Sequence, residues 1–172
     1  MTQLFLDTET ANLTTKNVVQ IAAILSSNGK ELASINLLIK PDNWTIDPKA
    51  QEIHGISLED CERYGVPIDA ALWLFDSLSN QADCIIAHNL QFDEGVIAGE
   101  YRRLGRQWLI PGRYCTMKES TNICKIPGPR GYKWPKLIEA HEFFMGCGFD
   151  GAHSAMEDTR ACLRIYNALQ KL

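Results

Sequence analysis

The chain lacks several features that define other classes of protein. It has six cysteines in 172 residues but no Cys-x-x-Cys pair, so the sequence predicts no zinc cluster. It contains no apolar run of about 18 residues, so no membrane span is expected. It does not begin with a secretory signal, and scattered cysteines without such a signal are typical of reduced thiols in the cytoplasm. These absences favour a cytoplasmic protein that is not inserted in a membrane.

Basic residues are fewer than acids, and more than half of them are concentrated in one segment of the chain. The chain has 17 lysines and arginines against 21 acids, which gives a net charge of −4. Residues 101–136 hold nine of the basic residues and one acid, so this segment carries +8 and the remainder −12. Such a stretch suits binding to a phosphate backbone, although Arg102, Arg103 and Arg106 are equally well explained as a solvated helix face.

Five side chains in three short segments are out of place in a folded core. They are Asp7, Glu9, Asp93, His153 and Asp158. Each acid occupies a position where an apolar side chain is expected, and several carboxylates do not share a dry interior unless cations neutralise them. Hard divalent cations prefer carboxylate oxygens, so the set predicts a magnesium or manganese site.

A short buried strand predicted over residues 3–9 carries the first two acids. Strand side chains alternate, so Asp7 and Glu9 project from the same face, two residues apart. Taken alone, an acid at a strand end is also explained as an exposed turn or cap.

Two predicted helices carry the other acids. Asp93 lies on the apolar stripe of a helix over 90–104, and Asp158 on that of the last helix, over 154–169. His153 precedes Asp158 by five residues, so it is expected on the loop or cap that leads into the last helix. Singly, Asp93 is explained equally well as a helix cap and His153 as a surface histidine, but these explanations do not account for the whole set.

Three motifs, in order along the chain, resemble those of the DEDDh 3′–5′ exonucleases, the DnaQ-like family that includes the proofreading subunit of bacterial DNA polymerase III and exonuclease X. That family carries Asp-x-Glu, then an Asp after a His-Asn pair, then His-x4-Asp. The matching residues here are Asp7 and Glu9, Asp93 after His88 and Asn89, and His153 and Asp158. Segments 53–56, 115–118 and 134–137 are also similar to family members, so the resemblance covers nearly the whole chain.

The resemblance implies an RNase H-like α/β fold, a mixed five-stranded sheet flanked by helices, formed by residues 1–172 as a single domain. The hydropathy pattern is compatible with this fold. Strands are predicted at about 3–8, 17–27, 31–39, 83–88 and 113–117, and helices near 47–80, at 90–104 and at 154–169. The dipeptide Asn28-Gly29 predicts a tight hairpin turn, and residues 125–135 are predicted to form a loop because they are rich in Pro and Gly.

The resemblance also implies the chemistry of the site. Two Mg²⁺ or Mn²⁺ ions, about 3.5–4 Å apart, would activate a water and neutralise charge at phosphorus. Asp7 would bridge both ions. Glu9 and Asp158 would complete the coordination of one ion, and Asp93 would serve the other, partly through water. His153 would be the general base that deprotonates the attacking water, a task that suits an imidazole.

Contacts with the terminal nucleotide follow from the same resemblance. The backbone at Thr10 and Ala11 would meet the 3′-hydroxyl, and Leu13 would wedge against the last base. Asn12 stands where many family members have Gly, and Asn tolerates the left-handed backbone of such a turn. His54 is expected to pack a short helix over the site and to contact the substrate.

Other candidate substrate contacts lie further along the chain. Asn89 follows a predicted strand that leads to the site. The predicted loop over 125–135 interleaves cations with Tyr132 and Trp134, a composition that suits the stacking of unpaired bases. Lys133 and Trp134 are its candidate substrate contacts, although packing alone also explains the tryptophan. His141 is expected on a helix surface.

The sequence therefore predicts a metal-dependent 3′–5′ exonuclease that releases nucleoside 5′-monophosphates from single-stranded or frayed 3′ ends. DNA is favoured over RNA because the motifs are most similar to those of proofreading and exonuclease X types. Two alternatives stay open: an exoribonuclease, and a non-catalytic module that binds nucleic acid or a polymerase. The intact acidic set argues against the module. The implied partners are single-stranded 3′ ends and, as a further candidate, a DNA polymerase or another replication protein.

Overall fold

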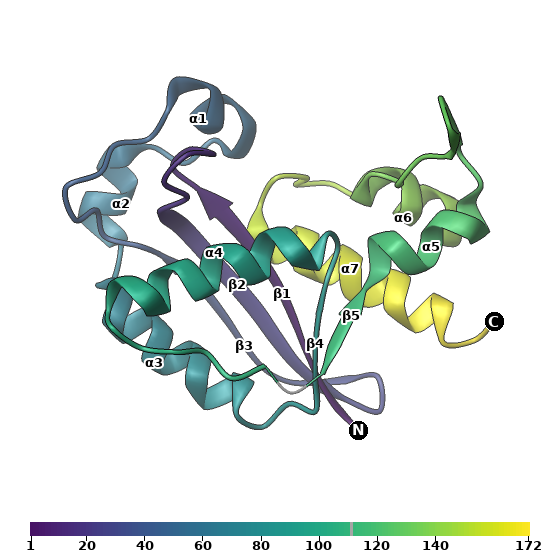
Figure 1. Ribbon diagram of the computed structural model, residues 1–172, viewed down its shortest axis with the longest axis horizontal. Coiled ribbons are helices and arrows are strands. Elements are labelled where there is room, and N and C mark those ends of the chain that lie inside the picture. Colours follow the sequence, from purple (N-terminus) through teal and green to yellow (C-terminus); the bar gives the residue numbers. More distant parts are fainter. Residues whose placement is uncertain (111) are drawn as a thin grey trace.

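A mixed five-stranded sheet forms the centre of the computed structural model, which describes residues 1–110 and 112–172 (Figure 1). Its strands are β1 (Thr2–Thr10), β2 (Val18–Ser27), β3 (Lys30–Leu38), β4 (Cys84–Ala87) and β5 (Arg113–Cys115). The order across the sheet is β3-β2-β1-β4-β5, and the first three strands form the expected antiparallel meander. Strand β4 is parallel to β1, and β5 is parallel to β4. The RNase H-like α/β architecture is therefore confirmed.

The central strand β1 alternates between two hydrophobic layers. Leu6 is buried in the larger core cluster, and its neighbour Phe5 is buried in a separate cluster on the opposite face. By the same alternation, Asp7 and Glu9 lie on the face of Phe5, whereas Thr8 lies on the face of Leu6. The strand thus carries the two acids out of the core on one face, as the sequence predicts.

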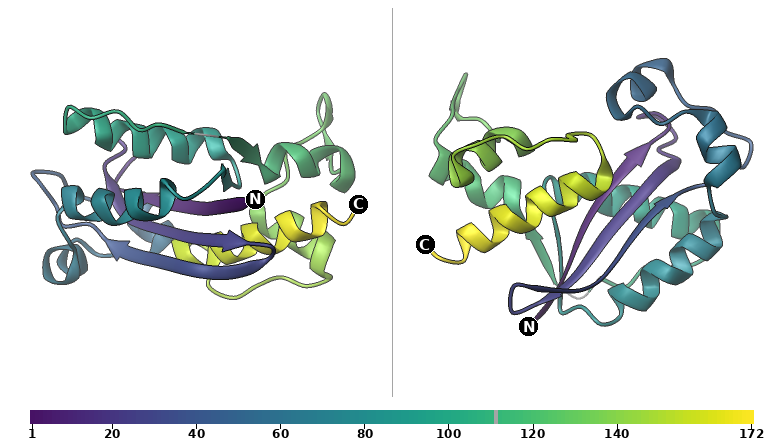
Figure 2. Two further views of the ribbon diagram at one scale, coloured as in Figure 1. Left: turned by 90° about the horizontal axis from the view of Figure 1, so that it is seen from below. Right: turned by 180° about the vertical axis from the view of Figure 1, so that it is seen from behind.

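Helices cover both faces of the sheet. On the face of Leu6, α3 (Ile68–Ser79) and α4 (Leu90–Arg103) contribute buried residues to the larger cluster. On the face of Phe5, α7 (Ala155–Leu169) contributes Cys162 to the smaller one. Views from the front and from behind place α4 and α7 on opposite sides of the sheet (Figures 1 and 2). Asp158 of the third motif, on α7, and Asp93 of the second motif, on α4, therefore approach β1 from opposite faces of the sheet.

Shorter helices lie beyond the sheet. The segment expected to be helical near 47–80 forms α1 (Pro48–His54), α2 (Leu58–Tyr64) and α3. Helix α1 begins at a side-chain cap, because Asp47 Oδ1 accepts a hydrogen bond of 2.8 Å from Lys49 N, and it ends at Gly55, whose φ of 71° favours glycine. Helices α5 (Thr116–Cys124) and α6 (Leu137–Met145) follow β5.

Three local expectations are wrong. Residues 125–135 are not an irregular loop, because β6 (Pro127–Gly128) and β7 (Gly131–Tyr132) pair as a small hairpin. Strand β5 ends at Cys115, since helix α5 begins at the next residue. His141 is buried at 3% exposure, and its Nδ1 lies 2.9 Å from the Cys147 carbonyl oxygen. The turn at Asn28-Gly29 is confirmed, with φ of 52° and 74°.

No helix in the described part of the chain is long and apolar enough to cross a membrane.

Candidate active site

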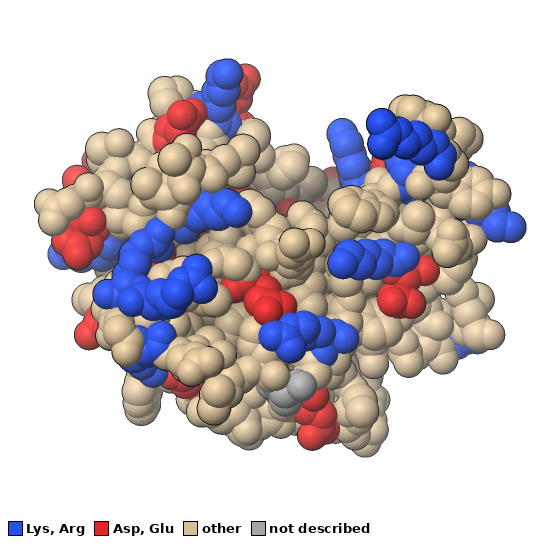
Figure 3. Space-filling model, viewed as in Figure 1, with Lys and Arg blue, Asp and Glu red and all other residues tan. Residues whose placement is uncertain are grey.

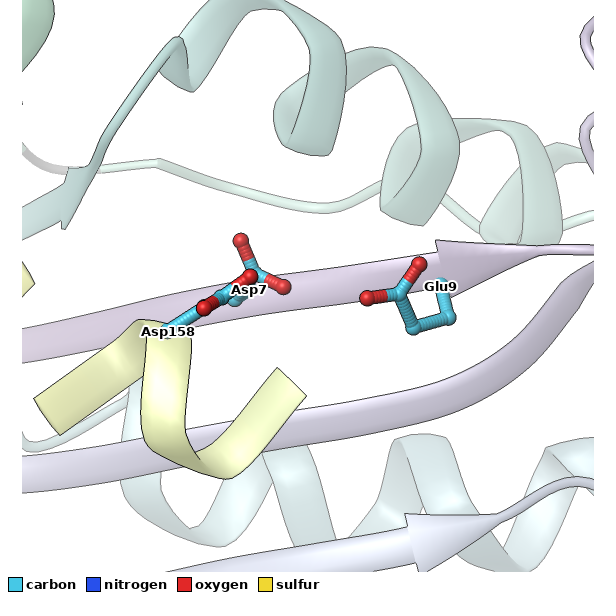
Figure 4. Close-up of side chains that lie close together, drawn as sticks. All are labelled: Asp7, Glu9 and Asp158. Atoms are coloured by element: carbon cyan, nitrogen blue, oxygen red, sulfur yellow. The ribbon is translucent and has the colours of Figure 1, made fainter. Parts of the chain in front are cut away.

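Three carboxylates meet where β1 leaves the core. Asp7 and Glu9 of β1 and Asp158 in the first turns of α7 each offer one oxygen, and these oxygens lie within 4.8 Å of one another. Figure 4 shows Asp158 reaching from α7 to the side of β1 that carries the other two. We call these three residues the acidic cluster. The pairing of β1 with β2 shifts between Glu9 and Thr10, an irregularity of the kind that re-aims side chains at sites.

One oxygen of the cluster lacks the partner that a buried oxygen normally has. Asp158 Oδ2 accepts a hydrogen bond of 3.2 Å from the backbone N–H of His153. Asp158 Oδ1 is buried, and it has no hydrogen-bond partner among residues 1–110 and 112–172. A buried acceptor without a donor is costly, and a bound cation would relieve that cost. The donor set, all carboxylate oxygens, fits a hard divalent ion such as Mg²⁺ or Mn²⁺.

The electrostatics of the cluster point the same way. Burial raises the pKa of Asp7 well above its usual range, and the charges of Asp93, Asp158 and Glu9 raise it further. Burial, followed by repulsion from Asp158 and Asp93, raises the pKa of Glu9 to about 8. Burial raises the pKa of Asp158 to about 6, although the nearby His153 opposes that shift. Without a cation, these carboxylates therefore bind protons more readily than carboxylates in water.

Asp93 lies beside the acidic cluster but outside it. It is 3% exposed, and its Oδ1 accepts hydrogen bonds from Thr8 N at 3.0 Å and from Thr8 Oγ1 at 2.8 Å. Burial raises the pKa of Asp93 to about 7, whereas the Thr8 hydrogen bonds lower it. Because Thr8 directly follows Asp7 in β1, these hydrogen bonds hold the Asp93 carboxyl group close to Asp7. Helix α4 thus delivers Asp93 from the opposite side of β1, with Thr8 fixing its position.

His153 occupies the turn that precedes α7, as its spacing from Asp158 predicts. It is exposed, with a left-handed φ of 70°. Its backbone N–H donates a hydrogen bond of 3.2 Å to Asp158 Oδ2, so this turn lies directly beside the acidic cluster. An exposed imidazole at the edge of an acidic cluster has the freedom to exchange protons with water and substrate.

A pocket of about 370 Å³ adjoins the acidic cluster at Glu9. It contains three of the predicted substrate-binding residues: Thr10, Leu13 and His54. Ile53 and Phe92 also line it, and the sequence reasoning missed both, although each directly precedes a motif residue. Leu13 and Ile53 are 76% and 57% exposed, which leaves an open apolar surface beside the acids.

His54 presents an unpaired nitrogen at this pocket. Its Nδ1 accepts a hydrogen bond of 3.1 Å from Ile56 N, and its Nε2 is buried with no partner in the described residues. Burial lowers the pKa of His54, and the nearby Thr10 backbone partly opposes this downward shift. The neutral imidazole therefore carries its proton on Nε2, which is buried near the Thr10 backbone.

Two details of the predicted nucleotide contacts need correction. Ala11 is fully buried, and its N–H already donates to Asn17 O at 2.9 Å, so that amide is not free to meet a 3′-hydroxyl. Asn12 does not adopt a left-handed backbone. Instead its Oδ1 accepts hydrogen bonds from Thr14 N at 2.9 Å and Thr15 N at 2.7 Å, so a side-chain turn replaces the glycine turn.

The remaining predicted contacts lie at other places. Asn89 is exposed at the start of α4 with φ of 78°. Lys133 and Trp134 lie beside the hairpin of β6 and β7 and line neither the acidic cluster nor the pocket at Glu9. Trp134 is 60% exposed, so packing does not explain it. The structure thus brings Thr10, Leu13 and His54 together with the acids and leaves the hairpin residues apart from them.

Comparison with known sequences agrees with this geometry. A family model described as exonuclease, the RNase T family, matches residues 4–166. An uncharacterized exonuclease of Escherichia phage 186 is 29% identical over 98% of this chain and 88% of its own length. The 3′–5′ exonuclease DinG of Bacillus subtilis is 28% identical over 78% of this chain, but this match spans only 14% of DinG.

Solved structures share the fold. Escherichia coli exonuclease I in complex with a dA16 oligonucleotide superposes with a TM-score of 0.81 at 21% identity, covering 99% of this chain and 41% of exonuclease I. A zinc-bound complex of the same enzyme with single-stranded DNA has a TM-score of 0.81 at 20% identity, covering 99% of this chain and 40% of that one. The chain thus spans less than half of these structural neighbours. With the family model matching nearly its full length, the chain belongs to the RNase T exonuclease family of the DnaQ-like superfamily.

Proposed function

We propose that the chain is a divalent-metal-dependent 3′–5′ exonuclease of the DEDDh type, which removes nucleoside 5′-monophosphates from single-stranded DNA. The observation that carries this proposal is the acidic cluster with the unpaired Asp158 Oδ1, because such an arrangement is costly without a cation. The position of His153 at its edge supports hydrolysis rather than binding alone.

The residues present fit a two-ion site. Asp7, Glu9 and Asp158 would hold one ion, and Asp7 with Asp93 would hold the other. When bound, Mg²⁺ or Mn²⁺ would supply charge neutralisation at the phosphate and would acidify water. The hydrogen bonds from Thr8 to Asp93 Oδ1 leave Oδ2 as the oxygen available for such an ion.

His153 would accept the proton of the attacking water at an imidazole nitrogen. Its backbone N–H bonds Asp158 Oδ2, so the turn that carries the imidazole is fixed relative to the acidic cluster. The water oxygen would form a bond to phosphorus while the bond from phosphorus to the 3′-oxygen of the preceding nucleotide breaks. That oxygen would take a proton from solvent water to become the new 3′-hydroxyl, and a 5′-monophosphate is released.

The pocket beside Glu9 would bind the terminal nucleotide. Leu13, Ile53 and Phe92 offer an apolar surface to the base, and His54 lines the same pocket. Four residues of α1 line this pocket, so the helix would limit how far a strand can extend past the acids, as a binding site for a chain end requires. The B. subtilis relative is itself described as a 3′–5′ exonuclease, which supports the polarity.

DNA is the proposed polymer because the exonuclease I neighbours were captured with DNA oligonucleotides. An exoribonuclease would use the same acidic cluster and differ in contacts to the 2′-hydroxyl. A DNA polymerase or other replication protein is a candidate partner through the resemblance to proofreading subunits.

The proposal is tested with single-stranded DNA and RNA of one sequence, each labelled at the 5′ end, in Mg²⁺, Mn²⁺ or EDTA. The expected result is a ladder that shortens from the 3′ end, needs the metal and forms faster on DNA. Asp7→Asn should abolish it. Binding without cleavage of either polymer would overturn the proposal in favour of a non-catalytic module.

A further inference from the structure

The hairpin of β6 and β7 is a defined structure with a tight tip. Gly128 pairs with Gly131, which leaves Pro129 and Arg130 as the two tip residues. A side chain at Gly128 would meet Lys133 N and Cβ at 3.1 Å, and Gly131 has φ of 119°, so both glycines are required by the geometry. The hairpin projects beyond α5 and α6 (Figure 1).

The base of the hairpin is tied to the strand that leads to the acidic cluster. His88, which directly follows β4, lies between two partners: its Nε2 is 2.9 Å from the Pro135 carbonyl oxygen, and its Nδ1 is 2.9 Å from Thr116 Oγ1. The carbonyl can only accept, so Nε2 carries the proton and donates it to Pro135. The same chain continues from His88 through Asn89 into α4, which presents Asp93.

A second tie lies on the other side of the base. Glu139 of α6 accepts hydrogen bonds from Lys133 Nζ at 2.5 Å and from Lys136 N at 2.7 Å. Lys133 N donates to Ile126 O at 2.9 Å across the hairpin. The hairpin is therefore held in place before any ligand arrives, which lowers the entropy lost on binding.

Two large aromatic side chains are left exposed on this fixed support. Tyr132 is 52% exposed and Trp134 is 60% exposed. Residues 125–136 contain four cations and no acid, and Arg130 is exposed at the tip. Exposed aromatics interleaved with cations match the chemistry of unpaired nucleotides, whose bases stack and whose phosphates carry negative charge.

The hairpin lies across the mouth of the site from the terminal-nucleotide pocket. In Figure 1 and in the rear view of Figure 2, α1 lies over the end of β1, and the hairpin rises apart from both, beside α5 and α6. The space-filling view is hollowed between α1 and the hairpin (Figure 3). Residues Gly128–Trp134 also border a surface hollow of about 630 Å³. A strand whose last nucleotide fills the pocket can cross the acidic cluster and continue toward the hairpin.

We infer that the hairpin is a second binding site, which holds unpaired nucleotides upstream of the scissile bond by stacking bases on Tyr132 and Trp134. His88 and Glu139 position it, and Arg130 meets the phosphates. The inference rests on the proposed function for its direction along the strand. It makes strand length a determinant of affinity, because a strand too short to extend from the pocket at Glu9 to the hairpin cannot contact both.

The test compares Kd values of a trinucleotide and of a strand of about 20 nucleotides, which exceeds a typical single-strand site. Fluorescence anisotropy in Mg²⁺ uses the full chain with Asp7→Asn, so that no cleavage occurs. Trp134→Ala should weaken binding of the long strand by about tenfold, and weaken the trinucleotide much less, with Tyr132→Ala similar and Trp134→Phe retaining most affinity. Trp73→Ala is the matched control, since Trp73 is 68% exposed on α3, on the sheet face covered by α4.

Each outcome decides the inference. Equal loss for both lengths, or equal Kd values for Trp134→Ala and Trp73→Ala on the long strand, would overturn it. Thermal melting and circular dichroism of each variant show whether the fold is intact, and Tyr132→Ala, for which the same length-selective loss is expected, keeps the test informative if Trp134→Ala does not fold. Cleavage by the chain with Asp7 intact is scored separately: no cleavage together with a length-selective loss would sink the exonuclease proposal and leave the hairpin as a binding site.

Discussion

The acidic cluster and the hairpin are both rich in charge, yet their charges stand in opposite environments. The cluster gathers carboxylates of one sign in a half-buried space, where burial and repulsion raise every pKa. The hairpin spreads cations and aromatics over exposed surface, where water screens them. Buried like charges destabilise the fold until a ligand arrives, whereas exposed charges add affinity at little cost in stability. Variants in the two regions should therefore separate stability from binding.

The largest effect is expected for Asp7→Asn, which removes one charge and keeps the shape. Exonuclease activity should fall about a thousandfold or more, because an ion ligand common to both proposed ions contributes several kcal/mol to the transition state. The metal-free variant should melt at a higher temperature than the unsubstituted chain, since the folded state no longer holds a carboxylate whose pKa is raised by burial. Single-turnover cleavage and melting in EDTA measure the two effects. A lower melting temperature in EDTA would contradict the account of the cluster.

The next effect is expected for His153→Ala. A lost general base costs about 10²- to 10⁴-fold in rate, so cleavage should fall within that range in saturating metal. The side chain is exposed, so the melting temperature should stay within about 1 °C. The pH–rate profile decides between a base and a substrate contact: the variant should lose the increase of rate with pH that a general base produces. A variant with a normal profile and a raised KM would show that His153 only contacts substrate.

The stability of the metal-free protein should depend on pH through the same carboxylates. A carboxyl group whose pKa is raised on folding stabilises the fold below its unfolded pKa, and this stabilisation is lost as pH rises through the folded pKa. Glu9 at about 8 and Asp93 at about 7 therefore predict that the melting temperature in EDTA falls by several degrees between pH 5 and about 9. Saturating Mn²⁺ should remove most of this fall, because it stabilises the ionised form. Glu9→Gln should flatten the upper part of the curve, and a flat curve for the unsubstituted chain would refute the prediction.

Sequence patterns predicted the acidic cluster better than its surroundings, for physical reasons. Asp7, Glu9 and Asp158 interrupt apolar patterns whose periods are fixed by strand and helix geometry, so their faces follow from spacing alone. The antiparallel meander follows from three apolar runs and the turn at Asn28-Gly29. The hydropathy pattern did not predict where one helix ends and the next begins between residues 47 and 80, because those ends are set by local hydrogen bonds at caps and glycines.

The parts that sequence did not predict depend on contacts between distant segments. Ile53 and Phe92 line one pocket although 39 positions separate them, and nothing in either local pattern marks that proximity. The burial of His141 depends on the carbonyl of Cys147 after the end of α6. The hairpin needs a pair of glycines that close onto Lys133, which a Pro- and Gly-rich composition does not distinguish from an irregular loop.

The smallest effect is expected for Glu139→Gln, which changes a charge at the hairpin and leaves the acidic cluster unchanged. The hydrogen bond from Lys133 and, to a smaller extent, that from the Lys136 backbone lower the pKa of Glu139. The contribution of Glu139 to stability is therefore present above its pKa in the unfolded chain, and it is lost as pH falls through its pKa in the folded chain. Both partners are partly exposed, so the ion pair is worth about 0–1 kcal/mol and the melting temperature should drop by less than about 4 °C.

The variant also releases Lys133 and removes one negative charge beside the hairpin. The glutamine carbonyl can still accept the Lys136 N–H, so the base of the hairpin keeps this tie. Affinity for a long single strand should therefore rise about twofold at low salt, with a slope of log Kd against log salt that is steeper by up to about one. If Lys133 meets no phosphate even when it is released, the slope will not change, and stacking on Tyr132 and Trp134 will then account for the hairpin's affinity without this lysine.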